Sequence, residues 1–350
     1  MGSLSPDTKK PWIQTPCIAS ASLSRAAGCN IYLKLENLQP SGSFKSRGVG
    51  NLMVRAAASA PSSQESHFYC SSGGNAGLAC ATSAIALNRK ATIVVPMTTS
   101  PLMISKLRLL GADVRQIGAN WAEADAHLRE VMLGNDPAGV YVPPFDHPHV
   151  WDGAATIADE LVSQLAAESS SPGNEVEVNG IVCSVGGGGL LAGLAQGVSQ
   201  NQWPGGSGKE PRLMAVETVG ADSLNASVLA GEHVTLPGIK SIAGSLGAVR
   251  VAARAWEVAR DTPGFRSVTV TDAEAALACV RFVDDAQLVV EVACGATIAT
   301  AYNGALRKHF DAGMSDEEWA RQNIVLIVCG GSNVTMEMLN GYRSKYGDAS

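Results

Sequence analysis

Lys45 is the residue of this chain whose chemistry is easiest to name. It lies in the segment SGSFKSRG, residues 41–48, shortly after the alternating run of residues 30–35. A lysine with small neighbours and one aromatic neighbour, Phe44, at a predicted strand-to-helix junction is presented to a ligand rather than to bulk water. Lysine amines form Schiff bases with carbonyl compounds, pyridoxal phosphate among them. Lys45 is therefore a candidate for attachment of a carbonyl ligand.

A run of four glycines separates a predicted buried strand from a predicted helix: Gly186, Gly187, Gly188 and Gly189. Glycine lets consecutive backbone N–H groups converge on an anion, and a helix N-terminus adds a favourable dipole. The run therefore predicts a phosphate-binding loop. The alternative, a flexible turn, is disfavoured by the position between strand and helix. The run matches neither GxGxxG nor GxxxxGKS, which disfavours a dinucleotide or ATP.

A second glycine-containing loop, residues 71–77 with the sequence SSGGNAG, also follows a predicted strand and precedes a helix. Its hydroxyl, amide and backbone N–H groups can bind a carboxylate, with Asn75 as a side-chain donor. An ordinary helix N-cap explains the same residues equally well. The loop by itself leaves both interpretations open.

Two residues at strand ends are further candidates, because ligands of open α/β sheets gather beyond the carboxyl ends of the strands. Cys329 ends the apolar run that starts at residue 323. Taken alone, Cys329 is better interpreted as a core thiol. Glu217 ends the run 213–217, where it can be a cation ligand, a base or a solvated carboxylate.

The composition is that of a compact protein with a large core. Of the 350 residues, 46% are hydrophobic and 17% charged, and the formal net charge is −6. This charge disfavours nucleic acid or an anionic membrane as a partner, and no apolar run is long enough to span a membrane. No secretory signal is visible. The eight cysteines lack CxxC spacing, which favours a reducing, cytoplasmic location.

Short β-rich runs alternate with longer helical stretches, which is typical of a parallel α/β sheet. We expect a small αβ domain over residues 43–149 and a large domain formed by residues 1–42 and 150–350. Asp272 is expected to cap the helix 273–283. The expected strands, in chain order, are residues 67–70, 91–96, 114–117, 140–142, 180–183, 213–217, 267–270 and 323–329.

Four motifs, in this order, resemble the eukaryotic L-serine dehydratase/L-threonine deaminase family: SGSFKSRG (41–48), CSSGGNAG (70–77), SVGGGGLL (184–191) and VCGGSN (328–333). The resemblance covers nearly the whole chain through three further segments: PPFD (143–146), ETVGA (217–221) and FVDD (282–285). The family consists of pyridoxal-phosphate enzymes of the tryptophan-synthase β fold. The resemblance thus implies an α/β protein of fold type II, with two open αβ lobes and the cofactor between them.

The resemblance also implies how the cofactor is held. Lys45 is the Schiff-base lysine, which also removes the substrate's Cα proton. The other implied contacts are Phe44 and Ser245 on opposite faces of the pyridine ring, Asn75 at its 3-oxygen, residues 186–189 at the phosphate and Cys329 at the ring nitrogen. A thiol is a weak, neutral partner for that nitrogen. It makes the ring a milder electron sink, which favours prompt β-elimination over transamination.

Substrate, cation and subunit contacts are implied in the same way. The substrate carboxylate is assigned to one loop: Ser72, Gly73, Gly74, Asn75 and Ala76. A monovalent cation, K⁺, is assigned to the Glu217 carboxylate and to backbone carbonyls near Gly186, Ala221 and Leu246. Oxygen ligands of this kind suit a hard cation. The family further implies a homodimer.

Five positions depart from the family pattern. One is Val292, where proline is common after Glu291, and the other four leave the choice of substrate open. Gly73 stands where the liver-type enzymes have alanine, and Asp152 stands where relatives carry a longer acidic residue. Ala154 replaces a bulkier polar residue, and Ser245 replaces a small apolar one. Gly73 and Ala154 are expected to enlarge the substrate pocket.

The favoured hypothesis is a pyridoxal-phosphate-dependent lyase that converts L-serine or L-threonine into pyruvate or 2-oxobutanoate and ammonia. One alternative is an amino-acid racemase, with Ser245 as a second acid/base, or a β-replacement enzyme on the same fold. Another is a catalytically silent binding or regulatory protein. The intact Lys45, Asn75 and glycine run count against that last alternative.

Overall fold

The computed structural model describes residues 9–60, 65–167, 176–204, 209–311 and 313–347. The chain divides into two compact units. The small unit consists of Gln39–Ala154 and the N-terminal segment up to Ile13, and the large unit consists of Gln14–Leu38 and Ala155–Ser350. The bounds differ from the expected 43–149 and 1–42 plus 150–350 mainly in where the N-terminal segment belongs.

Contacts of the N-terminal segment explain this difference. The Ile13 N–H donates to Gln39 Oε1 at 3.0 Å, and Gln39 Nε2 donates back to the Ile13 carbonyl at 2.8 Å. Pro11 and Trp12 lie close against Gly50, where an added Cβ would be 2.7 Å from Pro11 Cγ and 3.0 Å from Trp12 Cε3. The segment is thus packed on the small unit, a long-range relationship that sequence spacing does not reveal.

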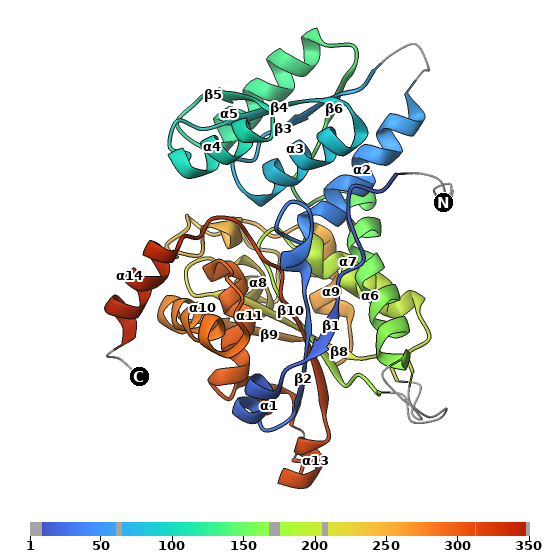
Figure 1. Cartoon of the computed structure of the whole chain (residues 1–350), viewed down its shortest axis with the longest axis vertical. Helices are drawn as coiled ribbons and strands as arrows, with labels where there is room; N and C mark the ends of the chain where they lie inside the picture. Colours follow the sequence, from blue (N-terminus) through green and yellow to red (C-terminus); the bar gives the residue numbers. More distant parts are fainter. Residues whose placement is uncertain (1–8, 61–64, 168–175, 205–208, 312, 348–350) are drawn as a thin grey trace. The chain divides into compact units, whose positions relative to one another are not determined.

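The small unit is built on a four-stranded parallel sheet in the order β5-β4-β3-β6 (Figure 1). Its strands are β3 (His67–Cys70), β4 (Lys90–Val95), β5 (Asp113–Gln116) and β6 (Gly139–Tyr141). Its helices are α2 (Lys45–Ser59), α3 (Asn75–Leu87), α4 (Pro101–Leu109) and α5 (Trp121–His127), followed by short turns at Leu128–Met132 and Leu133–Asn135. Fully buried Phe68, Ile93 and Leu107 belong to its main core.

The large unit contains a six-stranded sheet in the order β1-β2-β10-β7-β8-β9, in which β1 alone runs antiparallel to its neighbour. Its strands are β1 (Cys17–Ala19), β2 (Asn30–Lys34), β7 (Gly180–Ser184), β8 (Arg212–Thr218), β9 (Arg266–Val270) and β10 (Asn323–Ile327). β7 is buried along its whole length. Burial on both faces explains why its sequence is nearly continuously apolar, as is typical of a central parallel strand.

Helices occupy most of the remaining described residues of this unit. They are α1 (Ala21–Ala27), α7 (Gly189–Gln200), α8 (Ser223–Ala230), α9 (Ala253–Asp261), α10 (Asp272–Ala286), α11 (Val292–Tyr302), α12 (Ala305–Phe310), α13 (Asp316–Ala320) and α14 (Met336–Tyr346), with short turns at Glu36–Leu38 and Gly244–Leu246. α6 (Pro148–Ala167) begins in the small unit and continues into the large one. None of the helices in the described residues is long and apolar enough to cross a bilayer.

The cap predicted for α10 is wrong by one residue. Thr271, not Asp272, is the N-cap: its hydroxyl accepts from the Glu274 N–H at 3.1 Å, and Glu274 accepts from the Thr271 N–H at 2.8 Å. This reciprocal pair is a capping box. Asp272 becomes the first helical residue, and its carboxylate instead accepts from the Ser241 hydroxyl at 2.6 Å.

Candidate active site

Lys45 is the first residue of α2, and its Nζ donates a hydrogen bond to the carbonyl oxygen of Pro144 at 2.5 Å. The same nitrogen lies 5.1 Å from the centre of the Phe44 ring and 5.9 Å from that of Phe145. The face of an aromatic ring attracts a cation. Two rings and a carbonyl therefore orient the amine, while the side chain remains only half-buried.

Close backbone packing fixes the start of α2. A Cβ on Gly48 would lie 2.7 Å from the Val150 carbonyl oxygen, and a Cβ on Gly153 would lie 2.3 Å from the Arg47 carbonyl oxygen. Neither position has room for a side chain. α2 and the beginning of α6 thus pack backbone to backbone, and this contact holds Lys45 within the small unit.

The loop of residues 71–77 leads directly into α3, whose first residue is Asn75. A Cβ on Gly77 would lie 1.9 Å from the Ser72 carbonyl oxygen, so this turn requires glycine. The Ser72 hydroxyl accepts from the Gly74 N–H at 3.3 Å. The loop is therefore a tight turn before a 13-residue helix, a position that favours an anion.

The same unit brings Lys45 close to this loop. Cys70, which directly precedes the loop, is fully buried. The pKa of its thiol is lowered mainly by a hydrogen bond with Cys80, and to a lesser degree by the Ser72 N–H and the Lys45 charge. Lys45 therefore acts electrostatically on the residue at the entrance of the loop.

Asp125 supports the loop, and sequence reasoning missed it. This carboxylate is only 7% exposed. It accepts hydrogen bonds from the hydroxyls of Ser71 and Tyr141, which belong to the ends of two different strands. The available signal was an acidic residue beside the apolar Ala124 and Leu128, both fully buried on the same stretch of helix.

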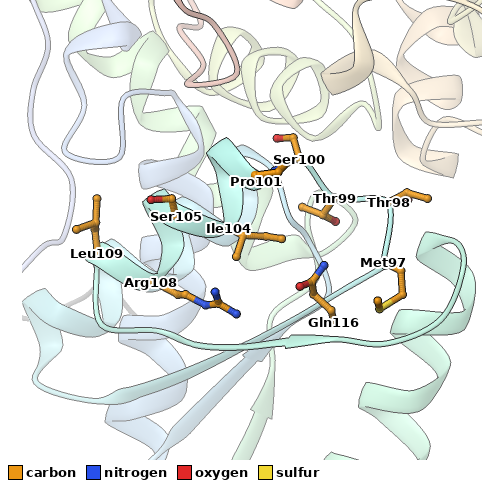
Figure 2. Close-up of a pocket in the computed structure, with 10 residues that line it drawn as sticks. All are labelled: Met97, Thr98, Thr99, Ser100, Pro101, Ile104, Ser105, Arg108, Leu109 and Gln116. Carbon is orange, nitrogen blue, oxygen red and sulfur yellow. The ribbon is translucent and has the colours of Figure 1, made fainter.

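A surface hollow of about 750 Å³ is lined in part by Thr99, which lies close to Gly73 of the loop. Figure 2 shows its lining, which comes from the turn after β4, from α4 and from the end of β5. It includes Arg108 and Gln116 but none of the residues predicted to bind cofactor or substrate. The hollow is connected to the candidate site through Thr99, whose side chain packs against Gly73.

The glycine run of the large unit joins β7 to α7. Gly188 has φ +88°, and a Cβ there would lie 2.4 Å from Ala255 Cβ. A Cβ on Gly186 would lie 2.8 Å from the Ser245 carbonyl oxygen. Among the described residues, no acceptor is bound by the backbone N–H groups of residues 186–189. A loop that requires glycine thus presents unpaired donors at the start of a 12-residue helix.

Cys329 lies two residues beyond β10 and is 6% exposed. Its Sγ is 3.4 Å from the Ser184 hydroxyl at the end of β7. A second thiol, Cys294 on α11, is hydrogen-bonded to Cys329, and burial followed by this contact raises the pKa of Cys294 well above its ordinary value. All eight cysteines are free. Cys329 is thus held by a hydroxyl and a protonated thiol.

Glu217, in β8, is 1% exposed and accepts from the Leu224 N–H at 2.9 Å and the Asn225 N–H at 2.7 Å. Burial raises the pKa of its carboxyl group to about 8 despite these two bonds. The nearby charge of Asp222 acts in the same direction. Ala221 follows in the same turn, where its N–H donates to the Thr218 carbonyl at 2.9 Å.

The remaining predicted positions have the following surroundings. Ser245 is exposed, and Leu246 beside it is 4% exposed. Asp152 lies 3.4 Å from His149 Nδ1, and Ala154 is 2% exposed. Their expected effects on the cofactor and the substrate pocket stay predictions.

Comparisons with known proteins decide the family. A model described as "Pyridoxal-phosphate dependent enzyme" matches residues 9–330. The chain belongs to this family. The bovine L-serine dehydratase/L-threonine deaminase is 41% identical over 335 residues, which cover 96% of each chain. The rat serine dehydratase-like protein is also 41% identical, over 95% of this chain and 94% of the rat protein.

A solved structure agrees with these sequence relatives. The L-serine ammonia-lyase from the fungus Rhizomucor miehei superposes with a TM-score of 0.83 at 34% identity, covering 96% of this chain and 99% of that one. The resemblance inferred from the four motifs and the fold class of pyridoxal-phosphate enzymes are thereby confirmed. Family membership implies pyridoxal phosphate as the cofactor.

The residues present fit that cofactor. Its phosphate needs several donors, and the N–H groups of residues 186–189 are unpaired within the described chain. Its aldehyde needs a primary amine, and Lys45 presents one at the N-terminus of α2. Both features follow from local backbone geometry in their own units.

Proposed function

We propose that this protein catalyses β-elimination from a hydroxy-amino acid, L-serine or L-threonine, to give pyruvate or 2-oxobutanoate and ammonia. The proposal is supported by the 41% identity over 96% of the chain to a bovine protein named for both activities. It is also supported by Lys45, whose amine donates to the Pro144 carbonyl and whose charge acts on Cys70, the residue directly before the loop 71–77.

Lys45 is assigned two tasks. Its amine would bind the aldehyde carbon of the cofactor and would also be the base that removes the Cα proton of the substrate. Pyridoxal phosphate, when bound, withdraws electrons from Cα and so stabilises negative charge there. The Pro144 carbonyl and the two phenylalanine rings orient the amine for both tasks.

The loop Ser72, Gly73, Gly74, Asn75 and Ala76 is assigned to the substrate carboxylate. It lies at the N-terminus of α3, where backbone N–H groups and the helix dipole favour an anion. Asn75 would additionally donate to the 3-oxygen of the cofactor. Binding the carboxylate here fixes the amino acid so that its Cα proton faces a base in a defined position.

In the large unit, residues 186–189 would hold the phosphate of the cofactor with their unpaired N–H groups, and Cys329 would contact its ring nitrogen. Ser184 at 3.4 Å and Cys294 keep the Cys329 side chain in place. Phe44 and Ser245 are assigned to the two faces of the ring. A neutral thiol at the nitrogen favours elimination over transamination.

A K⁺ ion is proposed at Glu217, together with carbonyls near Gly186, Ala221 and Leu246. Burial, with a smaller contribution from the charge of Asp222, raises the pKa of the Glu217 carboxyl group to about 8. A cation at this position would return the group to its charged form. K⁺ suits such a site because carbonyl and carboxylate oxygens are its natural ligands.

A homodimer in the cytoplasm completes the proposal. The eight free cysteines, of which all but Cys17 are buried, suit a reducing compartment. Sedimentation of the purified protein tests the dimer, and fractionation of cells that express it tests the location.

One experiment tests the function. The purified holoenzyme is examined for the visible absorption band of lysine-bound cofactor and then assayed for 2-oxo acid release from L-serine, L-threonine and their D and allo forms. We expect the band and oxo-acid release from an L-substrate, and loss of both in Lys45→Ala. A band that persists in Lys45→Ala contradicts the assignment of Lys45. Loss of optical activity without oxo-acid release identifies a racemase instead.

A further inference from the structure

Asp125 is a buried carboxylate in an apolar setting. It is on α5 between Ala124 and Leu128, both 0% exposed, and these pack in a cluster with Tyr69 and Val94. Burying a carboxylate costs free energy unless hydrogen-bond partners compensate. An apolar side chain would pack in this cluster at least as well. The role of the carboxylate therefore lies in the groups to which it is hydrogen-bonded.

Asp125 holds two strands at their carboxyl ends. Its Oδ1 accepts from the Ser71 hydroxyl at 2.6 Å and from the Tyr141 hydroxyl at 2.7 Å. Ser71 directly follows β3 and Tyr141 ends β6, and these strands are neighbours paired at Tyr69 and Tyr141. The other oxygen, Oδ2, lies 3.8 Å from Arg129, whose guanidinium also stacks 5.2 Å from the Tyr141 ring centre.

Each of the two strand ends leads into a different part of the candidate site. Ser71 is followed by the loop 72–76, which is assigned to the substrate carboxylate. Tyr141 is followed within three residues by Pro144, whose carbonyl oxygen accepts from Lys45 Nζ at 2.5 Å. One oxygen atom of Asp125 therefore couples the carboxylate loop to the segment that orients the amine.

We infer that Asp125 is a positioning residue that fixes the loop 72–76 and the Lys45 amine relative to one another through Ser71 and Tyr141. This role rests on the proposed function, because it assigns the loop to the substrate and Lys45 to the proton transfer. Asp125 itself contacts neither, and it acts only through the two hydroxyls.

Steady-state kinetics of the holoenzyme with L-serine, expressed per mole of bound cofactor, separate the effect of the Ser71 hydrogen bond from that of the Tyr141 hydrogen bond. Ser71→Ala is expected to raise KM about tenfold with a smaller change in kcat, because it frees the carboxylate loop. Tyr141→Phe is expected to lower kcat about tenfold with a smaller change in KM, because it frees the segment that holds the amine. Asp125→Ala is expected to show both defects, and Asp125→Asn smaller ones, since an amide oxygen still accepts a hydrogen bond.

A double-mutant cycle checks the coupling. Ser71→Ala combined with Asp125→Ala is expected to raise KM no further than Asp125→Ala alone, because the same bond is removed. The matched control is Tyr69→Phe. Tyr69 is paired with Tyr141 across β3 and β6, but its hydroxyl donates at 2.8 Å to a different carboxylate, that of Asp136. It is expected to leave KM and kcat within about twofold of the parent values.

Hydrogen exchange of the holoenzyme without substrate provides a readout that needs no activity. Asp125→Asn and Ser71→Ala are expected to speed exchange of amides in residues 72–77, and Asp125→Asn also of the amides of Val142, Phe145 and Asp146, with β4 unchanged. The inference is overturned if the variants lower the unfolding temperature but leave KM, kcat and the exchange rates of these amides at the parent values. It is also overturned if Tyr69→Phe produces the same changes as the Asp125 and Ser71 variants. A parent protein that binds the cofactor but releases no oxo acid contradicts the proposed function, while exchange still decides the role of Asp125.

Discussion

Thr99 leaves no room for a methyl group on Gly73: an added Cβ would lie 2.6 Å from Thr99 Cγ2 and 3.1 Å from its Oγ1. We therefore expect Gly73→Ala to shift the carboxylate loop and to destabilise the protein by about 1–3 kcal/mol. KM for L-threonine should rise more than KM for L-serine, because the larger substrate has less room. Urea unfolding and steady-state kinetics measure the two effects.

The Thr99→Ala background provides the control for that prediction. It removes both clashing atoms, so the stability cost of Gly73→Ala should shrink by about 1 kcal/mol or more. Thr98→Ala, in the same turn and exposed, should not reduce the cost. If Gly73→Ala lowers the free energy of unfolding equally in the parent, Thr99→Ala and Thr98→Ala proteins, the loop adapts without involving Thr99.

Gly188 provides a second prediction. Alanine at this position would be strained, because φ is +88° and an added Cβ would lie 2.4 Å from Ala255 Cβ. We expect Gly188→Ala to destabilise the protein by about 1–3 kcal/mol and to weaken cofactor binding, because the N–H groups of the loop no longer converge. Cofactor titration followed by absorbance measures the affinity. Gly341→Ala in α14, where an added Cβ meets nothing within 4 Å, should be neutral or stabilising.

Much of this site is predictable from sequence because its key parts are local. The glycine run joins β7 directly to α7, and Lys45 is the first residue of α2, so short motifs predict the local geometry of both. The same locality explains the error at Asp272. Thr271 and Asp272 are both good N-cap residues, and the choice depended on Glu274, which completes the capping box with Thr271.

Asp125 and Thr99 could not be predicted, because their partners are distant in sequence. Asp125 is 54 residues from Ser71 and 16 from Tyr141, and nothing in the spacing links the three side chains before β3 and β6 are paired. Thr99 touches Gly73 only because β3 and β4 are neighbouring parallel strands whose carboxyl ends meet. The chemistry could be inferred from motifs, but the contacts that position it required the sheet order.

Cys329 provides a prediction about the reaction course. Cys329→Ser keeps a neutral partner beside Ser184, so we expect kcat for elimination to fall by less than about tenfold. Cys329→Asp introduces a negative partner that keeps the ring nitrogen protonated, so oxo-acid release should fall and transamination should rise. Product analysis by chromatography distinguishes the two. Unchanged product ratios in Cys329→Asp would show that Cys329 does not contact the ring of the cofactor.

Glu217 provides the pH prediction. Its pKa is raised from 4.5 to about 8 in the folded protein, so between these values the folded state binds a proton that the unfolded state has lost. The associated stabilisation is therefore complete below about pH 4.5 and disappears as the pH rises through about 8. Stability should fall with a slope of up to about 1.4 kcal/mol per pH unit in this window when K⁺ is absent.

Saturating K⁺ should flatten this slope, because a bound cation favours the ionised carboxylate and lowers its pKa. Glu217→Gln should flatten it without K⁺, since the amide does not titrate and one oxygen still accepts from the Leu224 or Asn225 N–H. Urea unfolding at several pH values in tetramethylammonium and potassium buffers measures all three slopes. A slope that is the same in both buffers would rule out a K⁺ ion at Glu217, and one that persists in Glu217→Gln would assign the titration to another group.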